Sequence, residues 1–167
     1  RGAAQTVLAP ALRRFLSAYP AISLDVTVDD DESDIVGGRF DAGIRIGRRI
    51  AKDMQMLRVS EPSRLIAMAS PAYLSGHPAP ASPNDLQKHA CIRLRNNGQI
   101  VDWEFQKGNN KVDVSVSGPL TVDNMELMVR AALEGVGMGY AMEFHIADHI
   151  AAGHLVPLLL YWSVSRH

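Results

Sequence analysis

The sequence predicts an α/β fold, because patterns typical of amphipathic helices alternate along the chain with patterns typical of strands. An apolar stripe at helical spacing runs through residues 6–18, and Pro20 ends it. Residues 22–28, ISLDVTV, then alternate apolar and polar side chains with a period of two. A short helical turn over 33–38 and a strand over 40–47 follow. We expect these strands to pair in parallel.

Further elements follow from capping and turn residues. Strands are expected at 54–59 and 63–70. Ser-Pro pairs beginning at Ser70 and Ser82 predict two short helices, because serine caps a helix N-terminus and proline fits its first position. Short strands are then expected at 91–95, 101–106, 111–118 and 119–122, with a turn at 108–110.

The last third of the chain contains two expected helices. The first spans 123–135, with Asp123 as N-cap, Glu126 closing a capping box and Gly135 ending the helix. The second spans 144–153 and ends at Gly153. A strand at 136–142 separates them, and a final strand is expected at 155–162.

The block of about residues 70–140 is predicted to be a second lobe inserted into the first. The chain enters it through 63–70 and returns through 136–142. Two crossing strands of this kind form a hinge beside a crevice, where open α/β sheets commonly bind small ligands.

Composition excludes several functions. The chain has 17 basic and 18 acidic residues, a formal net charge of −1, and no run rich in lysine or arginine. A nucleic-acid-binding surface is therefore not expected on this segment. One cysteine cannot form an internal disulfide, and no apolar run reaches the roughly 18 residues of a membrane span. A reduced, cytoplasmic compartment is expected.

Several phrases of the sequence occur together in a known order. They are VLAPALRRFLSAYP, ISLDVTV, DIVGGRFDAGIRIG, ASPAYL, DLQKHACIRLR, WEF, AALEGVGMGY and IAAGHLVPLL. In this order and spacing they resemble the effector-binding domain of LysR-type transcriptional regulators over nearly the whole chain. The resemblance implies two Rossmann-like lobes joined by two crossing strands, a periplasmic-binding-protein-like fold of type II. Lobe I would comprise 1–67 and 143–167, and lobe II 68–142.

The resemblance also implies partners. A small-molecule effector would bind in the cleft between the lobes, and the domain would form a homodimer or tetramer. DNA would be bound only through an N-terminal winged helix-turn-helix that is absent from this chain. The family's first strand and its final strand and helix have no counterpart here, so lobe I is expected to lack them. The dimer is predicted to use the helix at 6–18 and the strand at 22–28, whose open edge favours pairing with a second copy.

Candidate effector-binding residues follow from the strand ends and the resemblance. Helix N-termini present free backbone N–H groups that favour anions. The walls of the cleft are predicted to contain Gly2, Ala3, Asp29, Asp30, Arg93, Asp123 and Asn124, and its floor Ala69, Ser70 and Tyr140. LysR-type regulators often have a hydroxyl where Ala3 stands, so either the effector is not a simple carboxylate or backbone N–H groups make that contact here. These walls suit a small polar or aromatic acid. The ring of Tyr140 is expected to be packed, with its hydroxyl alone reaching the ligand.

Other candidate residues have two interpretations each. Arg45 either pairs with a carboxylate such as Asp41 or faces the cleft. His145 and His149 have metal-ligand spacing, but no third ligand supports a site, so they are interpreted as surface histidines. Cys91 is interpreted as a small core residue rather than a redox sensor.

Three classes of function were compared with these features. A ligand-sensing regulatory module that performs no chemistry fits them best. The alternative is an exported solute-binding protein of the same architecture. An enzyme is not expected, because the sequence has no nucleophile–His–acid set, Gly-rich phosphate loop or metal cluster, and no cofactor is expected either.

Overall fold

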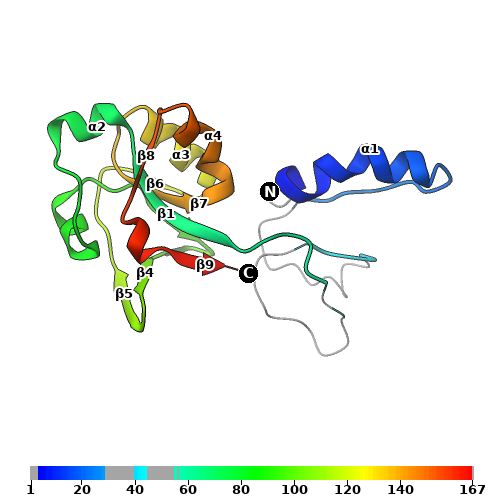
Figure 1. Cartoon of the computed structure of the whole chain (residues 1–167), viewed down its shortest axis with the longest axis horizontal. Coiled ribbons are helices and arrows are strands. Elements are labelled where there is room, and N and C mark those ends of the chain that lie inside the picture. Colours follow the sequence, from blue (N-terminus) through cyan, green and yellow to red (C-terminus); the bar gives the residue numbers. More distant parts are fainter. Residues whose placement is uncertain (1–3, 29–39, 45–54, 56, 167) are drawn as a thin grey trace. The chain divides into compact units, whose positions relative to one another are not determined.

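The computed structural model describes residues 4–28, 40–44, 55 and 57–166 (Figure 1). The chain divides into two compact units, Arg1–Pro62 with His167, and Ser63–Arg166. The lobe boundaries predicted from the sequence stay a prediction.

The first unit contains the helix expected at 6–18. A π-helical turn, η1 (Ala4–Leu8), continues as α1 (Ala9–Ala18). Pro10 lies in the first turn of α1, just after the junction with η1. The helix prediction is confirmed, and no residue of α1 is buried within the structure.

The strand predicted at 22–28 is wrong as a description of this chain. Residues 22–28 are described, and none of them belongs to a strand. Ile22, Leu24, Val26 and Val28 are between 42% and 47% exposed. Alternation indicates which face of a strand would be buried, but a strand also needs a neighbour to accept and donate its ladder hydrogen bonds. Strand structure is likewise absent from the described residues 40–44 and 57–59, whereas Arg45 lies outside the described residues.

The second unit is built on a central antiparallel sheet (Figure 1). β1 (Ser63–Ala69) lies between β7 (Gly139–Met142) and β8 (Val156–Leu158), and β9 (Val164–Arg166) also pairs with β1. In the register, Leu65 faces Met142 and Met68 faces Gly139. The two crossing strands expected at 63–70 and 136–142 therefore lie side by side.

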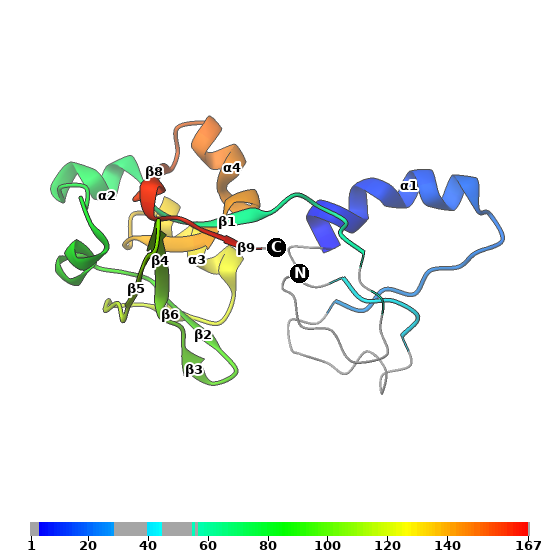
Figure 2. The ribbon, with the colours of Figure 1, turned by 60° about the horizontal axis from the view of Figure 1, so that its bottom comes forward.

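Two smaller sheets complete the unit (Figure 2). β2 (Arg93–Asn96) pairs in parallel with β6 (Thr121–Val122) and antiparallel with β3 (Gln99–Ile100). β4 (Trp103–Lys107) and β5 (Asn110–Val114) form a hairpin. Its turn contains Gly108 with a φ of +60°, so the turn predicted there is confirmed.

Both Ser-Pro helices are confirmed. They are α2 (Pro71–Gly76) and the 3₁₀ helix η2 (Pro83–Lys88). The Ser70 hydroxyl accepts from the Tyr73 N–H at 3.3 Å, and Ser82 forms a capping box with Asp85. Two longer helices, α3 (Met125–Leu133) and α4 (Glu143–Ala151), and a short η3 (Leu160–Trp162) follow. None of the described helices is both long and apolar enough to cross a bilayer.

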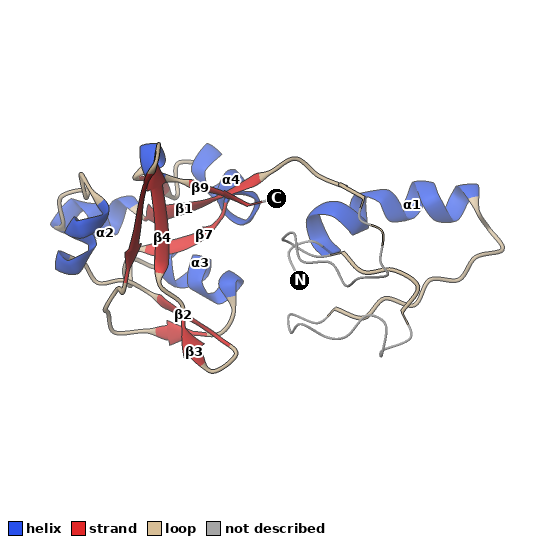
Figure 3. Cartoon of the chain, turned by 90° about the horizontal axis from the view of Figure 1, so that it is seen from below, coloured by secondary structure: helices blue, strands red, loops and turns tan. Residues whose placement is uncertain are grey.

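The core consists of two layers of buried side chains, one on each face of the central sheet, and Figure 3 shows the helices and strands that contribute them. Ile66 and Met68 pack with α3 and α4, whereas Ala67 and Ala69 point the other way, toward the β4–β5 hairpin and η2. The helix-side layer includes Met128, Val129, Ala132 and Ile146, and the hairpin-side layer includes Leu86, Cys91, Trp103, Phe105 and Tyr140. Because β1 contributes to both layers, it is buried on both faces over its last four residues.

Candidate functional site

The carboxyl ends of three strands of the second unit point in one direction. β2 and β6 are parallel, and the bridge between Cys91 and Met138 makes β2 and the segment leading into β7 parallel as well. α3 begins directly after β6, and α4 begins directly after β7. Two helix N-termini therefore follow the carboxyl ends of parallel strands, the usual position of ligands in α/β folds.

Asn124 is the N-cap of α3. Its side-chain oxygen accepts a hydrogen bond from the Leu127 N–H at 3.0 Å, and its backbone is extended, with φ −130° and ψ 126°. The prediction of Asp123 as N-cap, with Glu126 closing a capping box, is wrong by one residue. Both Asp123 and Asn124 can cap, and the chain turns into the helix only after Asn124. Glu126 instead lies 3.8 Å from Arg130, one turn further on.

We expect Asn124→Ala to lower the free energy of unfolding by about 1 kcal/mol, because the Leu127 N–H then loses its acceptor. Asn124→Asp should retain most of the stability, since a carboxylate caps equally well. Urea unfolding followed by circular dichroism measures both values. Asp123→Ala is the matched control and should change stability by less than about 0.5 kcal/mol, because Asp123 is exposed and does not cap the helix. Equal losses at the two positions would contradict the assignment of the cap.

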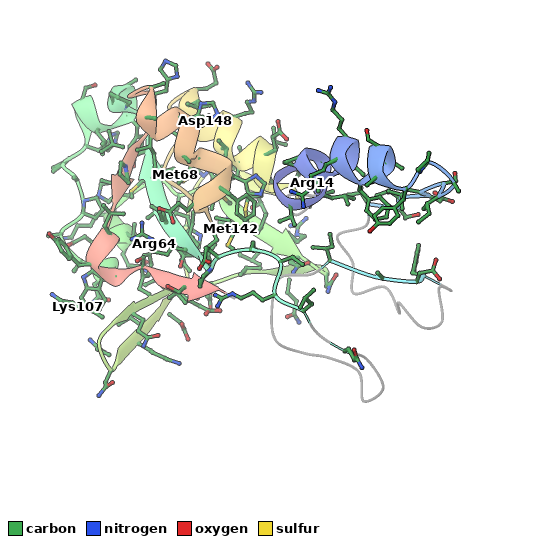
Figure 4. The ribbon with its side chains drawn as sticks, turned by 45° about the vertical axis from the view of Figure 1, so that its right-hand side comes forward. Arg14, Arg64, Met68, Lys107, Met142 and Asp148 are labelled. Atoms are coloured by element: carbon green, nitrogen blue, oxygen red, sulfur yellow. The ribbon has the colours of Figure 1, made fainter. Side chains whose placement is uncertain are left out.

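An ion pair joins β1 to the start of α4. Arg64 donates two hydrogen bonds to Glu143, from Nη2 at 2.6 Å and from Nε at 3.2 Å. Figure 4 shows Arg64 close to Met142, the residue before Glu143. The hydrogen bond from Arg64 lowers the pKa of Glu143, and the same bond raises the pKa of Arg64. Their side chains are 43% and 37% exposed, so the pair contributes at most about 1 kcal/mol.

Arg93 begins β2 and is half-buried. Ile92 and Leu94, its neighbours along the chain, pack in the helix-side layer, whereas Cys91 packs in the hairpin-side layer. The side chain of Arg93 therefore belongs to the face of β2 opposite α3. Its Nε is buried and has no hydrogen-bond partner among the described residues. A buried guanidinium N–H without an acceptor is costly, so this group is suited to receive one.

Two predicted ligand residues, Ala69 and Ser70, lie at the other end of α3. Ser70 is buried, and its hydroxyl caps α2. The same hydroxyl lies 3.5 Å from the position a Cβ would take on Gly135, which follows the end of α3. Asn124 is at the start of α3, and nine residues of helix are about 13 Å long. The structure thus does not bring Ser70, or its neighbour Ala69, together with Asn124.

Tyr140 is built into the hairpin-side layer. Its ring lies 5.1 Å from that of Trp103 and 5.3 Å from that of Phe105. Its hydroxyl donates to the carbonyl oxygen of Glu104 on β4. The ring of Tyr140 is packed, as expected, and its hydroxyl is directed to Glu104. The predicted ligand residues Gly2, Ala3, Asp29 and Asp30 lie outside the described residues and stay predictions, as does the ligand role of the other six.

The histidines of the last helix were considered as metal ligands. The rings of His149 and His154 are 6.4 Å apart, and His145 lies one turn before His149. Within the described part of the chain, no group of three His, Cys, Asp or Glu side chains could hold a metal ion.

Comparison with known proteins establishes the family. A model described as the LysR substrate binding domain matches residues 1–167. The chain belongs to the LysR substrate-binding domain family. A Pseudomonas aeruginosa PAO1 protein named as a transcriptional regulator is 39% identical over 160 residues, which are 95% of this chain and 52% of that protein. The HTH-type transcriptional regulator PgrR of Escherichia coli K12 is 35% identical over 94% of this chain and 53% of its own length.

Solved structures share the fold of this LysR substrate-binding domain. The regulatory domain of AphB from Vibrio vulnificus, treated with cumene hydroperoxide, matches 99% of this chain and 83% of its own, with a TM-score of 0.84 and 24% identity. The effector domain of AmpR from Pseudomonas aeruginosa matches 99% of this chain and 77% of its own, with a TM-score of 0.71 and 23% identity. The predicted periplasmic-binding-protein-like α/β fold of type II is confirmed.

The family also decides the class of function. The chain is the effector-binding regulatory domain of a LysR-type transcriptional regulator, and its relatives are regulators rather than enzymes. It spans about half the length of the curated relatives that it matches. The family assignment made from the sequence is confirmed.

Proposed function

We propose that this LysR substrate-binding domain binds a small acidic effector, a polar or aromatic acid, and that Arg93 receives its carboxylate. The observation that carries the proposal is the buried Nε of Arg93, which has no acceptor among the described residues. Arg93 pairs with Thr121, which lies three residues before Asn124, the N-cap of α3, while the Arg93 side chain itself is on the face of β2 opposite α3. In the predicted cleft between two lobes, Gly2, Ala3, Asp29 and Asp30 would supply the remaining contacts.

Calorimetry with a library of small acids and their uncharged amides tests the proposal. We expect acids to bind and the matching amides to bind at least tenfold more weakly, because a hydrogen bond to a charged partner contributes about 1.5–3 kcal/mol. Arg93→Gln should weaken the acid by roughly 10- to 100-fold. Arg95→Gln is the matched control, since Arg95 is exposed on the same strand, and should bind as the parent does.

Asn124→Leu provides a second variant at the same end of α3. Its bulk should abolish binding of an acid that the parent domain binds, with the loss of stability limited to that of the cap. Equal affinity for acid and amide, together with unchanged binding by the Arg93 and Asn124 variants, would contradict the proposal.

We further propose that two copies associate through α1 and residues 22–28. Phe15, Leu16, Ile22 and Leu24 are exposed apolar side chains of this region, and contiguous exposed apolar surface favours association. Sedimentation at tens of micromolar, on the order expected to populate a weak dimer, should show a dimer that Phe15→Glu dissociates. A parent chain that sediments as a monomer would count against this interface. The proposal has three further parts. The protein acts in the cytoplasm, its dimers assemble into a tetramer, and it binds DNA through a separate N-terminal domain.

A further inference from the structure

A histidine lies buried between two helices and a strand-like segment of the second unit. His89 follows η2, is 9% exposed, and has its Nδ1 3.2 Å from the Tyr73 hydroxyl of α2. The same hydroxyl accepts a hydrogen bond from the backbone N–H of Ala90 at 3.0 Å. Tyr73 therefore connects α2 to both the side chain of residue 89 and the backbone of residue 90.

Tyr73 and His89 share one proton-dependent hydrogen bond. In the His89 tautomer whose Nδ1 is unprotonated, the Tyr73 hydroxyl donates to Nδ1 while its oxygen accepts from the Ala90 N–H, so the buried O–H has an acceptor. If Nδ1 were protonated, two donors, the imidazolium N–H and the Tyr73 O–H, would face each other. The hydroxyl would then have to turn its proton away from Nδ1 into a buried space.

The neighbouring histidine has the opposite arrangement. The Nδ1 of His77 lies 3.0 Å from the Tyr73 carbonyl oxygen, which can only accept, so this nitrogen carries a proton already. The His77 ring is exposed and stacks on the Tyr73 ring at 4.3 Å. Protonation of His77 therefore breaks no hydrogen bond, which makes it a matched control for His89.

The segment that follows His89 is held tightly on both sides. The Ala90 carbonyl accepts from Met138 N–H and the Cys91 N–H donates to the Ser117 carbonyl, both at 2.8 Å. A Cβ on Gly137 would lie 2.5 Å from the Ala90 oxygen, so the backbones are in close contact. A change at His89 and Ala90 is consequently transmitted to the segment that leads into β7.

The surroundings of His89 disfavour its charged form. Burial, and then the nearby His77, lower the pKa of His89 below its ordinary value of 6.5. Lys88 acts in the same direction and Asp85 against it, and Tyr73 and Cys91 are the other titratable groups close by. Because the pKa of His89 is lower in the folded chain, the unfolded chain binds more protons as the solution is acidified. The contribution of neutral His89 to the free energy of unfolding is therefore complete above about pH 6.5 and is lost as pH falls through the folded-state pKa.

We propose that His89 is an acid-sensitive latch of this domain: protonation at Nδ1 breaks the Tyr73–His89 hydrogen bond and releases α2 from residues 89–92. The proposal is independent of the effector, because it rests on contacts within residues 73–138 alone.

Nuclear magnetic resonance on the whole chain tests the latch. The imidazole of His89 should titrate below the ordinary histidine range. As pH falls, exchange of the Ala90 amide should accelerate relative to its intrinsic rate, with the same midpoint. His89→Asn places a neutral oxygen near the Nδ1 position, and should make Ala90 exchange follow only the intrinsic dependence on pH. In His77→Gln the acceleration at Ala90 should persist.

Tyr73→Phe provides a second measurement if the His89 variant unfolds. Without the hydroxyl, nothing requires Nδ1 to stay unprotonated, so the titration midpoint of His89 should rise. A His89 midpoint that is ordinary in the parent, or unchanged in Tyr73→Phe, would overturn the latch. So would Ala90 exchange that accelerates equally in the His89→Asn variant.

Discussion

Gly118→Ala is expected to lower the free energy of unfolding by about 3 kcal/mol. A Cβ at this position would overlap the carbonyl oxygen of Cys91 and lie 2.6 Å from its backbone nitrogen. These are backbone atoms, which no side-chain rotation can move away. The strand-like segment at Cys91 would have to separate from Ser117, whose carbonyl accepts the Cys91 N–H. Urea unfolding followed by far-ultraviolet circular dichroism measures the loss.

Gly76→Ala is the matched control for that experiment. Gly76 ends α2, and a Cβ there would meet nothing within 4 Å. Its replacement should change stability by less than about 0.5 kcal/mol. If the two alanine variants unfolded at the same urea concentration, the close approach of residue 118 to Cys91 would be refuted.

Trp103→Ala is expected to cost about 3–5 kcal/mol, because it removes the largest buried side chain of the hairpin-side layer. Trp103 is 1% exposed, and its ring stacks on that of Tyr140 at 5.1 Å. The change would also remove the stacking contact between the β4–β5 hairpin and Tyr140 of β7. Thermal and urea unfolding by circular dichroism are suitable measurements, since the change removes a fluorophore.

Tyr161→Ala is the control for Trp103→Ala, because it removes an aromatic side chain that is exposed. Tyr161 is 87% exposed, so its loss should leave the unfolding midpoint almost unchanged. Trp103→Phe should fall between the two, because a smaller ring fills part of the space. A stability loss below about 1 kcal/mol for Trp103→Ala would show that the hairpin does not pack on the central sheet.

Elements set by local chemistry were predictable from the sequence. The Ser-Pro pairs at Ser70 and Ser82 start helices because capping and the proline geometry act within a few residues. The turn at Gly108 and the helix end at Gly135 need a positive φ, which glycine adopts without strain. The two crossing strands were identified for a related reason: each is a short apolar run bounded by turn or cap residues.

Other elements depend on contacts that one sequence does not show. The segment 22–28 has strand alternation, but the described residues offer it no pairing partner. The β2–β3 hairpin was missed although its signal was present. Asn97 and Gly98 have φ values of 47° and 80°, the pair of positive angles that Asn-Gly favours in a two-residue hairpin turn.

The candidate site was only partly predictable. Arg93 lies on a strand and Asn124 at a helix N-terminus, as expected, because such positions can be recognised from sequence; their role in binding stays a prediction. The Arg64–Glu143 ion pair was missed, because its members are 79 residues apart and nothing local connects them. Ser70 and Tyr140 turned out to hold the fold together, through the cap of α2 and the bond to Glu104. A polar residue at a strand end serves packing or binding, and only its partners distinguish the two.

Because Cys91 is buried, the rate at which its thiol is alkylated reports how often the surrounding structure opens. Its thiol is inaccessible, and burial raises its pKa to about 12. An exposed cysteine has a pKa of about 8.5, so the folded chain holds on the order of a thousandfold less thiolate at any neutral pH. A thiol reagent must therefore wait until residues 89–92 separate from Gly118 and Gly137. Because the chain has one cysteine, the rate of its alkylation at low denaturant, with enough reagent for alkylation to outpace reclosing, would give the frequency of that separation without an introduced label.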